Sequence, residues 1–237
     1  QPNGEYALTG EVFYKVPKKS LLGGKYGMDI AVNFTTVNSP IRNNIDIASD
    51  TLSRGYTSTI GDLFKPGDKL YYQDINIEIK KKFNKKWKGT LSYINLTYNE
   101  DISLGLAGER KEFKVTGNLN AHILVADATY KINRKHSLRA ELQHLQTEDH
   151  RKNWATALVE YTFAPNWFAA VLDQYNYGNP VNDQKLHYYY ATVGYINKGN
   201  RFTIGYGRQR AGVFCVGGVC RTVPASNGLS LSITSTF

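Results

Sequence analysis

The C-terminal segment constrains the fold most, because it alternates strictly between two kinds of side chain. Leu229, Leu231, Ile233 and Phe237 fall at odd positions, and Ser or Thr fills every even position between them. A two-residue period gives a β-strand with one apolar face and one hydroxyl-rich face. Such a strand fits the edge of a soluble sandwich as well as the wall of a membrane barrel, so the rest of the chain must decide between them.

The same alternation recurs along the chain, whereas no segment shows sustained helical spacing. Ile75, Ile77 and Ile79, for example, alternate with polar and charged residues. A membrane barrel needs this pattern because one face of each strand meets lipid and the other meets water or a packed lumen. We predict eleven antiparallel strands, at about 5–16, 25–36, 70–83, 87–98, 118–132, 137–147, 153–163, 167–177, 185–196, 201–210 and 226–237.

The predicted connections alternate between short and long ones. The short ones include 84–86 and 164–166, and the longest are about 37–69, 99–117 and 211–225. Outer-membrane barrels have short periplasmic turns and long outer loops, so we expect these three long loops to be extracellular. A soluble sandwich or a lipocalin-like barrel is the alternative. The sequence therefore predicts an all-β fold, an antiparallel up-and-down transmembrane β-barrel, with 1–237 as a single domain in the outer membrane of a Gram-negative bacterium.

The strand count raises a question of completeness. Eleven is odd, whereas bacterial barrels have an even number of strands with both ends in the periplasm. Either a short strand lies within 37–69, around Ile45–Ile47, or further strands precede residue 1. We expect the second, so that the 11–12 strands visible here are the C-terminal portion of a larger barrel.

Composition and charge exclude membrane-spanning helices and argue against nucleic-acid binding. The chain has a formal net charge of +9 and 17 Tyr residues, and its mean hydropathy is −0.42. No apolar run reaches the ~20 residues of a membrane helix, so a lipid-spanning backbone must be a closed sheet. The basic residues gather in turns, around 18–19, 80–88 and 133–135, without a recognised nucleic-acid motif. We therefore predict no nucleic-acid partner.

Three segments carry a resemblance to known proteins. They are Tyr206–Leu229, Ala140–Glu148 and Asp173–Pro180. Together they resemble a family of uncharacterised outer-membrane β-barrels from Bacteroidota, and the loop R-Q-R-A-G-x-x-C-x-G-G-x-C-R is their most specific piece. The resemblance covers about Leu22 to Phe237, and members of that family look longer on the N-terminal side. It implies an outer-membrane barrel and assigns no activity. The last strand is also similar to barrel-closing strands, which implies that Phe237 is part of the C-terminal signal read by the barrel assembly machinery.

The two cysteines, Cys215 and Cys220, flank Val-Gly-Gly-Val. Gly217 and Gly218 can take the positive φ angles of a tight reversal, which brings the sulfurs together. In an oxidising compartment we expect a disulfide that shapes the loop tip, although so short a ring contributes only about 2 kcal/mol. A zinc site lacks further ligands nearby, and a redox pair usually has closer spacing. We predict no metal and no cofactor.

Two further groups follow from strand parity and turn position. The predicted lumen-facing charges are Glu11, Asp29, Asp74, Glu78, Lys80, Asp127, Arg139, Glu141, Glu160 and Arg208. The predicted periplasmic aromatic girdle, next to short turns, consists of Trp87, Trp167, Phe83 and Phe163. Because the lumen charges mix both signs, they fit either a filled interior or a hydrated pore.

Three functions remain open at this point. The first is a porin-like channel or transport barrel, and the second is a structural scaffold subunit of a larger outer-membrane complex. The third is an outer-membrane hydrolase using His144 or Asp149, although no Ser nucleophile is spaced to complete a triad. We favour a non-enzymatic barrel whose partners are membrane lipid, lipopolysaccharide, the assembly machinery and other outer-membrane proteins or lipoproteins.

Overall fold

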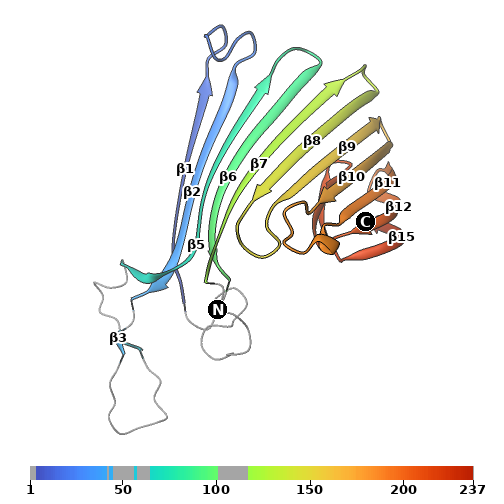
Figure 1. Ribbon diagram of the computed structural model, residues 1–237. Coiled ribbons are helices and arrows are strands. Elements are labelled where there is room, and N and C mark those ends of the chain that lie inside the picture. The colour runs from blue at the N-terminus through green and yellow to red at the C-terminus, as the bar shows by residue number, and fades with distance from the viewer. Residues whose placement is uncertain (1–3, 42, 45–55, 58–64, 101–116, 237) are drawn as a thin grey trace.

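A computed structural model describes residues 4–41, 43–44, 56–57, 65–100 and 117–236, which are mostly β-strand. Eleven strands form one antiparallel sheet (Figure 1). They are β1 (Tyr6–Val16), β2 (Met28–Pro40), β5 (Pro66–Lys82), β6 (Trp87–Asn99), β7 (Asn118–Lys131), β8 (His136–Gln146), β9 (Trp154–Phe163), β10 (Trp167–Tyr175), β11 (His187–Asn197), β12 (Asn200–Gln209) and β15 (Ser226–Ser235). Outside this sheet lie β3 (Asn43–Asn44), β4 (Tyr56–Thr57), β13 (Gly212–Val216), β14 (Val219–Val223) and a 3₁₀ turn, η2 (Asn182–Gln184).

The strands of the main sheet follow one another in the order β1-β2-β5-β6-β7-β8-β9-β10-β11-β12-β15. This confirms the predicted all-β antiparallel sheet of eleven strands, with boundaries that differ by only a few residues. The small β3–β4 ladder is separate from the main sheet. The alternative strand around Ile45–Ile47 lies outside the described residues, as do the expected assembly signal Phe237 and most of the loop 99–117.

Two of the short turns share the same local chemistry. The Asn84 side-chain oxygen accepts hydrogen bonds from the backbone N–H of Lys86 and Trp87, at 2.8 and 2.9 Å. Asn133 does the same for the two residues that close the next tight turn, at 2.8 and 3.0 Å. Asn stabilises a reversal in this way because its side chain replaces a missing backbone partner. The tight turns lie together at one end of the sheet (Figure 1).

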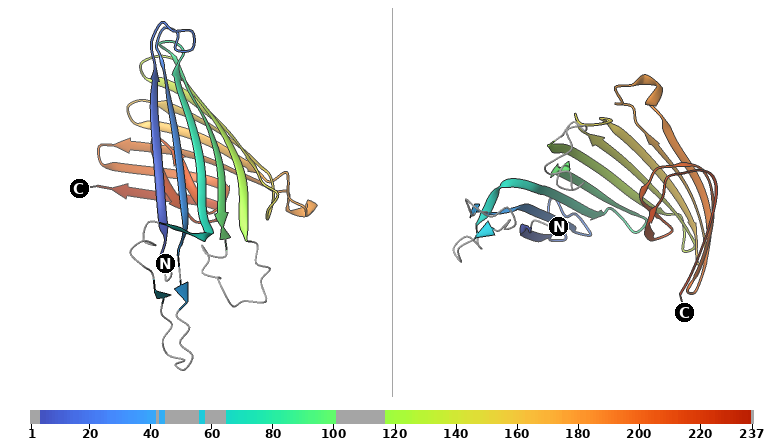
Figure 2. Two further views of the ribbon diagram at one scale, coloured as in Figure 1. Left: turned by 90° about the vertical axis from the view of Figure 1, so that its left-hand side faces the viewer. Right: turned by 90° about the horizontal axis from the view of Figure 1, so that it is seen from below.

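The sheet is curved but open (Figure 2). At its two edges, β1 pairs only with β2 and β15 pairs only with β12 among the described residues. The structure therefore differs from the closed barrel that the alternation predicts. The intrinsic twist of the strands accounts for the curvature, but closure also needs the two edges to meet, and β1 and β15 lie far apart along the arc.

The register fixes which side chains share a face, because directly opposite residues point the same way. Ala169, Val193, Ile204 and Leu231 form one row across β10, β11, β12 and β15. Ile204 is 50 % exposed and Leu231 72 % exposed, on the convex face. A continuous exposed apolar surface of this kind marks a protein or membrane contact rather than an ordinary water-facing surface.

The buried core is small and lies on the opposite, concave face. It consists of Leu158, Phe168, Ala170, Leu172, Tyr190, Phe214 and Val216. Two glycines make room for its rings. A Cβ atom at Gly194 would lie 2.1 Å from the Phe168 ring, and one at Gly205 would lie 2.0 Å from the Tyr190 hydroxyl. Glycine within a strand is expected where another group approaches the backbone this closely.

The segment 211–225 is more ordered than the loop that the sequence predicts. It forms the β13–β14 hairpin, and the side chains of Phe214 and Val216 bury against the concave face. The loop 37–69 is also shorter than predicted, because β2 continues to Pro40 and β5 begins at Pro66. Among the described residues, no helix is both long enough and apolar enough to cross a membrane.

Candidate functional site

The predicted lumen charges of β1 to β9 lie together on the concave face. The register places Asp29 opposite Lys80, and Arg139 opposite Glu160. Glu11, Asp74, Glu78, Asp127 and Glu141 occupy the same face by strand alternation. Arg208 lies near the end of β12, and its guanidinium lies 4.7 Å from the ring centroid of Tyr188, which shares a face of β11 with Tyr190. The concave face therefore carries the charged side chains of the sheet, beside its apolar core.

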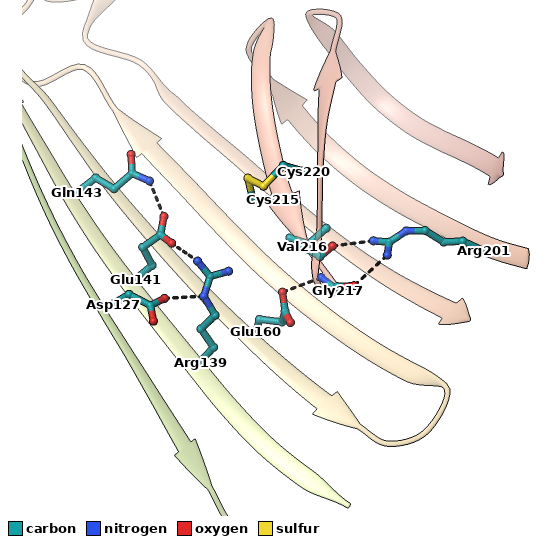
Figure 3. Close-up of a disulfide and its surroundings, with 10 residues drawn as sticks. All are labelled: Asp127, Arg139, Glu141, Gln143, Glu160, Arg201, Cys215, Val216, Gly217 and Cys220. Atoms are coloured by element: carbon teal, nitrogen blue, oxygen red, sulfur yellow. Dashed lines mark hydrogen bonds and ion pairs between the residues drawn. A yellow bond between two sulfur atoms is a disulfide. The ribbon is translucent and has the colours of Figure 1, made fainter. Parts of the chain in front are cut away.

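A network of four side chains lies on this face, on β7 and β8 (Figure 3). Arg139 Nε donates to Asp127 Oδ2 at 2.5 Å, and the same guanidinium contacts Glu141. Gln143 Nε2 donates to Glu141 Oε1 at 2.5 Å. Asp127 and Glu141 lie directly opposite each other on β7 and β8, where two like charges repel. Arg139 offsets this repulsion, so the network holds the two strands together while keeping the wall polar.

The β13–β14 hairpin lies over the neighbouring part of the concave face. Cys215 and Cys220 form a disulfide with a Cα–Cα distance of 4.0 Å, which the sequence predicts. Beyond the disulfide, the tip turns at Gly217 and Gly218, whose φ angles are 57° and 76°. Positive φ angles such as these favour glycine. The disulfide therefore closes a compact tip that projects across the sheet.

Two buried ionisable side chains anchor this tip (Figure 3). Glu160 Oε2 accepts a hydrogen bond from the Gly217 N–H at 2.9 Å. Arg201 donates to the Gly217 carbonyl at 3.1 Å and to the Val216 carbonyl at 2.8 Å. Glu160 is 6 % exposed and Arg201 is 9 % exposed, so both depend on these bonds to replace water. We call this set of contacts the hairpin latch.

Sequence reasoning identified Glu160 but missed Arg201 and the latch. The signal was present in the predicted outer loop, where Phe214 and Val216 alternate with Val213 and Cys215. A solvent-facing loop has little reason to carry this pattern, which is typical of a strand that buries one face.

A cavity of about 570 Å³ lies near the long connections. Leu119, Ile123 and Leu145 form an apolar wall, and the guanidinium of Arg210 lies 3.7 Å from the ring centroid of Trp154. Burial lowers the pKa of Arg210, the electrostatic interaction with Tyr188 partly opposes this shift, and the nearby Arg151 adds to it. The cavity therefore combines an apolar wall with a partly desolvated cation at the mouth of the concave face.

The four predicted girdle residues are all exposed beside short turns. Phe83 is 60 % exposed, Trp87 44 %, Phe163 42 % and Trp167 49 %. Trp87 stacks on Tyr130 with ring centroids 4.6 Å apart. Exposed aromatic rings at one level of a sheet fit a membrane–water interface, although such rings also pack across strands in soluble sheets.

The residues considered for hydrolysis have separate partners. His144 Nε2 lies 2.5 Å from the Tyr177 hydroxyl, and Asp149 accepts a hydrogen bond from the Asn120 N–H at 3.1 Å. His150 pairs with Glu100 at 2.7 Å. Within the described ranges, no hydrogen bond joins His144 to Asp149, and no cluster of His, Cys, Asp or Glu has the arrangement of a metal site.

The chain belongs to a family of unknown function, DUF6029, whose model matches residues 1–237. No curated protein and no solved structure matches the chain. The sequence resemblance also points to an uncharacterised family, and the family match agrees with this. The match does not identify the source organism, the cysteine loop motif or an activity.

Proposed function

We propose that this chain forms the wall of an outer-membrane β-barrel channel in a Gram-negative bacterium. In this arrangement the convex face meets lipid and the concave face lines a hydrated lumen. The observation that carries the proposal is a convex face covered with exposed apolar side chains, while the charged side chains of the sheet gather on the concave face. Val171 and Leu231 stand 58 % and 72 % exposed on one face, while Arg139 and its carboxylates lie on the other. In water this exposed apolar surface would be unfavourable, whereas contact with lipid chains removes it from water.

In a membrane, the two open edges of the sheet must find hydrogen-bonding partners. In hydrocarbon each unpaired backbone N–H or C=O costs several kcal/mol. The outer edges of β1 and β15 must therefore pair with further strands in the membrane. Closing the curved sheet in this way places the charged network and the hairpin latch inside the lumen.

The lumen so formed favours passage of small polar solutes without strong selection by charge. Ring-like arrangements of a single sign select ions, but Arg139 is balanced here by Asp127 and Glu141. The latched hairpin occupies part of the cross-section and so limits the size of the solute. The bound partners are lipid along the convex face, lipopolysaccharide at the long-connection end, and the assembly machinery during insertion.

A scaffold function is the second candidate, and the two free edges favour it. A partner protein could add strands to β1 or β15 and use this sheet as a platform in the outer membrane. The same apolar convex face serves both functions.

Single-channel recording in planar bilayers tests the proposal. Inserted protein should give stepwise conductance with weak preference between small cations and anions. Insertion without conductance, together with co-purification of a stoichiometric partner after detergent extraction, would favour the scaffold instead. Failure of the protein to enter lipid at all would remove both candidates.

A further inference from the structure

Two neighbouring turns repeat one sequence pattern, an Asn followed by two basic residues and an aromatic ring. The first is Asn84–Trp87 and the second is Asn133–His136. Backbone hydrogen bonds fix these turns in the sheet, because Lys131 N donates to Lys86 O at 2.8 Å and Ala164 N donates to Lys135 O at 2.7 Å. The basic side chains are therefore held side by side at the short-turn end.

These side chains surround a cavity of about 480 Å³ between the two turns. We define the basic turn cluster as Lys85, Lys86, Lys131, Arg134 and Lys135. None of the five forms an ion pair with a carboxylate of the described residues. The cluster therefore presents uncompensated positive charge to whatever lies beyond the turns.

The adjoining strands increase this charge. Lys82 lies directly opposite Lys88 on β5 and β6, where two like charges destabilise a sheet. Within the described part of the chain, neither lysine has a carboxylate partner. Both side chains share the concave face with Lys80, so they raise the charge of the short-turn end from the lumen side and are not part of the basic turn cluster.

Aromatic side chains at the same level indicate what kind of anion this end meets. Lys86 Nζ lies 6.0 Å from the ring centroid of Tyr130, which stacks on Trp87, and Lys81 Nζ lies 6.0 Å from the Phe83 ring. Lysines that extend along exposed aromatic rings are typical of the headgroup level of a bilayer. A soluble polyanion would account for the lysines, but not for the apolar convex surface that continues to these rings.

We propose that the basic turn cluster binds the phosphate groups of anionic phospholipids in the leaflet next to the short turns. This inference rests on the proposed position of the sheet in a membrane. The cavity accepts a headgroup phosphate between the two turns, while the acyl chains lie along the convex face beside Trp87 and Phe83. Lipid of this kind then fixes the depth and tilt of the sheet at its short-turn end.

The test compares two triple variants of the full chain. The first is Lys85→Gln, Arg134→Gln and Lys135→Gln. The control is Lys65→Gln, Lys69→Gln and Lys185→Gln, which removes the same charge from exposed lysines near the long connections. Native mass spectrometry from detergent, with phosphatidylglycerol and phosphatidylcholine in competition, measures the preference for the anionic lipid.

The first variant should lose this preference by about fivefold per removed cation, on the order of 100-fold for all three at low salt. The control should keep it. Flotation with phosphatidylcholine vesicles separates the possible failures. Protein that does not float contradicts the proposed membrane function, whereas protein that floats but shows no preference for phosphatidylglycerol overturns only the present inference. Equal losses in both variants, or tight binding of polyphosphate in place of phosphatidylglycerol, also overturns it.

Discussion

Replacing Ile204 by arginine distinguishes a convex face in lipid from one in water. Ile204 lies in the middle of β12, opposite Val193 and Leu231, and is 50 % exposed. In water an arginine at this exposed position keeps its charge solvated and should change stability by no more than about 0.5 kcal/mol. At the midplane of a bilayer the same change should cost roughly 2–4 kcal/mol. The ratio of folded to unfolded protein would then fall roughly 30- to 1,000-fold.

Urea unfolding of the protein in lipid vesicles measures this loss. Ile77→Arg should repeat the effect on β5, and Asn76→Arg is its matched control, because Asn76 faces the concave side next to Asp74 and Glu78 in the strand. Thr203 is a poor control for Ile204, since the hairpin leaves it only 4 % exposed. Equal losses at the two neighbouring positions of β5 would refute the assignment of the faces.

Three other outcomes follow from the hairpin and the core. Cys215 and Cys220 should resist a membrane-impermeant maleimide in intact cells until a reductant is added, and labelling without reductant would exclude the disulfide. Arg201→Met should free the hairpin tip, since two hydrogen bonds from a charged donor contribute about 1.5–3 kcal/mol each, and unchanged conductance and protease resistance would argue against the latch. Gly205→Ala should destabilise the protein by about 1–3 kcal/mol in a urea titration, whereas Gly10→Ala, with nothing within 4 Å of its Cβ, should not.

The sequence predicts the strands well because they carry a strong local signal. Alternation such as that of Ile75 to Ile79 specifies both a strand and its two faces, and the register then follows from pairing consecutive strands through tight turns such as Asn84–Lys86. For this reason the sequence alone assigns the charges around Arg139 to one face of the sheet.

Closure and the hairpin latch could not be predicted in the same way. Closure of the sheet depends on the twist summed over all strands and on the strands that pair with β1 and β15. No short segment of the sequence specifies either of these. The latch joins Glu160 to Gly217 across 57 positions, and Arg201 reaches the same tip from another strand. Contacts of this kind depend on tertiary packing, so spacing rules that work for strands and turns do not reveal them.

Two pairs of like charges face each other across neighbouring strands, and they differ in whether an opposite charge compensates them. Asp127 faces Glu141 on the concave wall, and Arg139 compensates both from within the fold. Lys82 faces Lys88 near the short turns, and no described carboxylate compensates them. The compensated pair therefore belongs to the structure of the wall, whereas the uncompensated pair shares the concave face with Lys80 and is separate from the basic turn cluster for which we propose an anionic lipid.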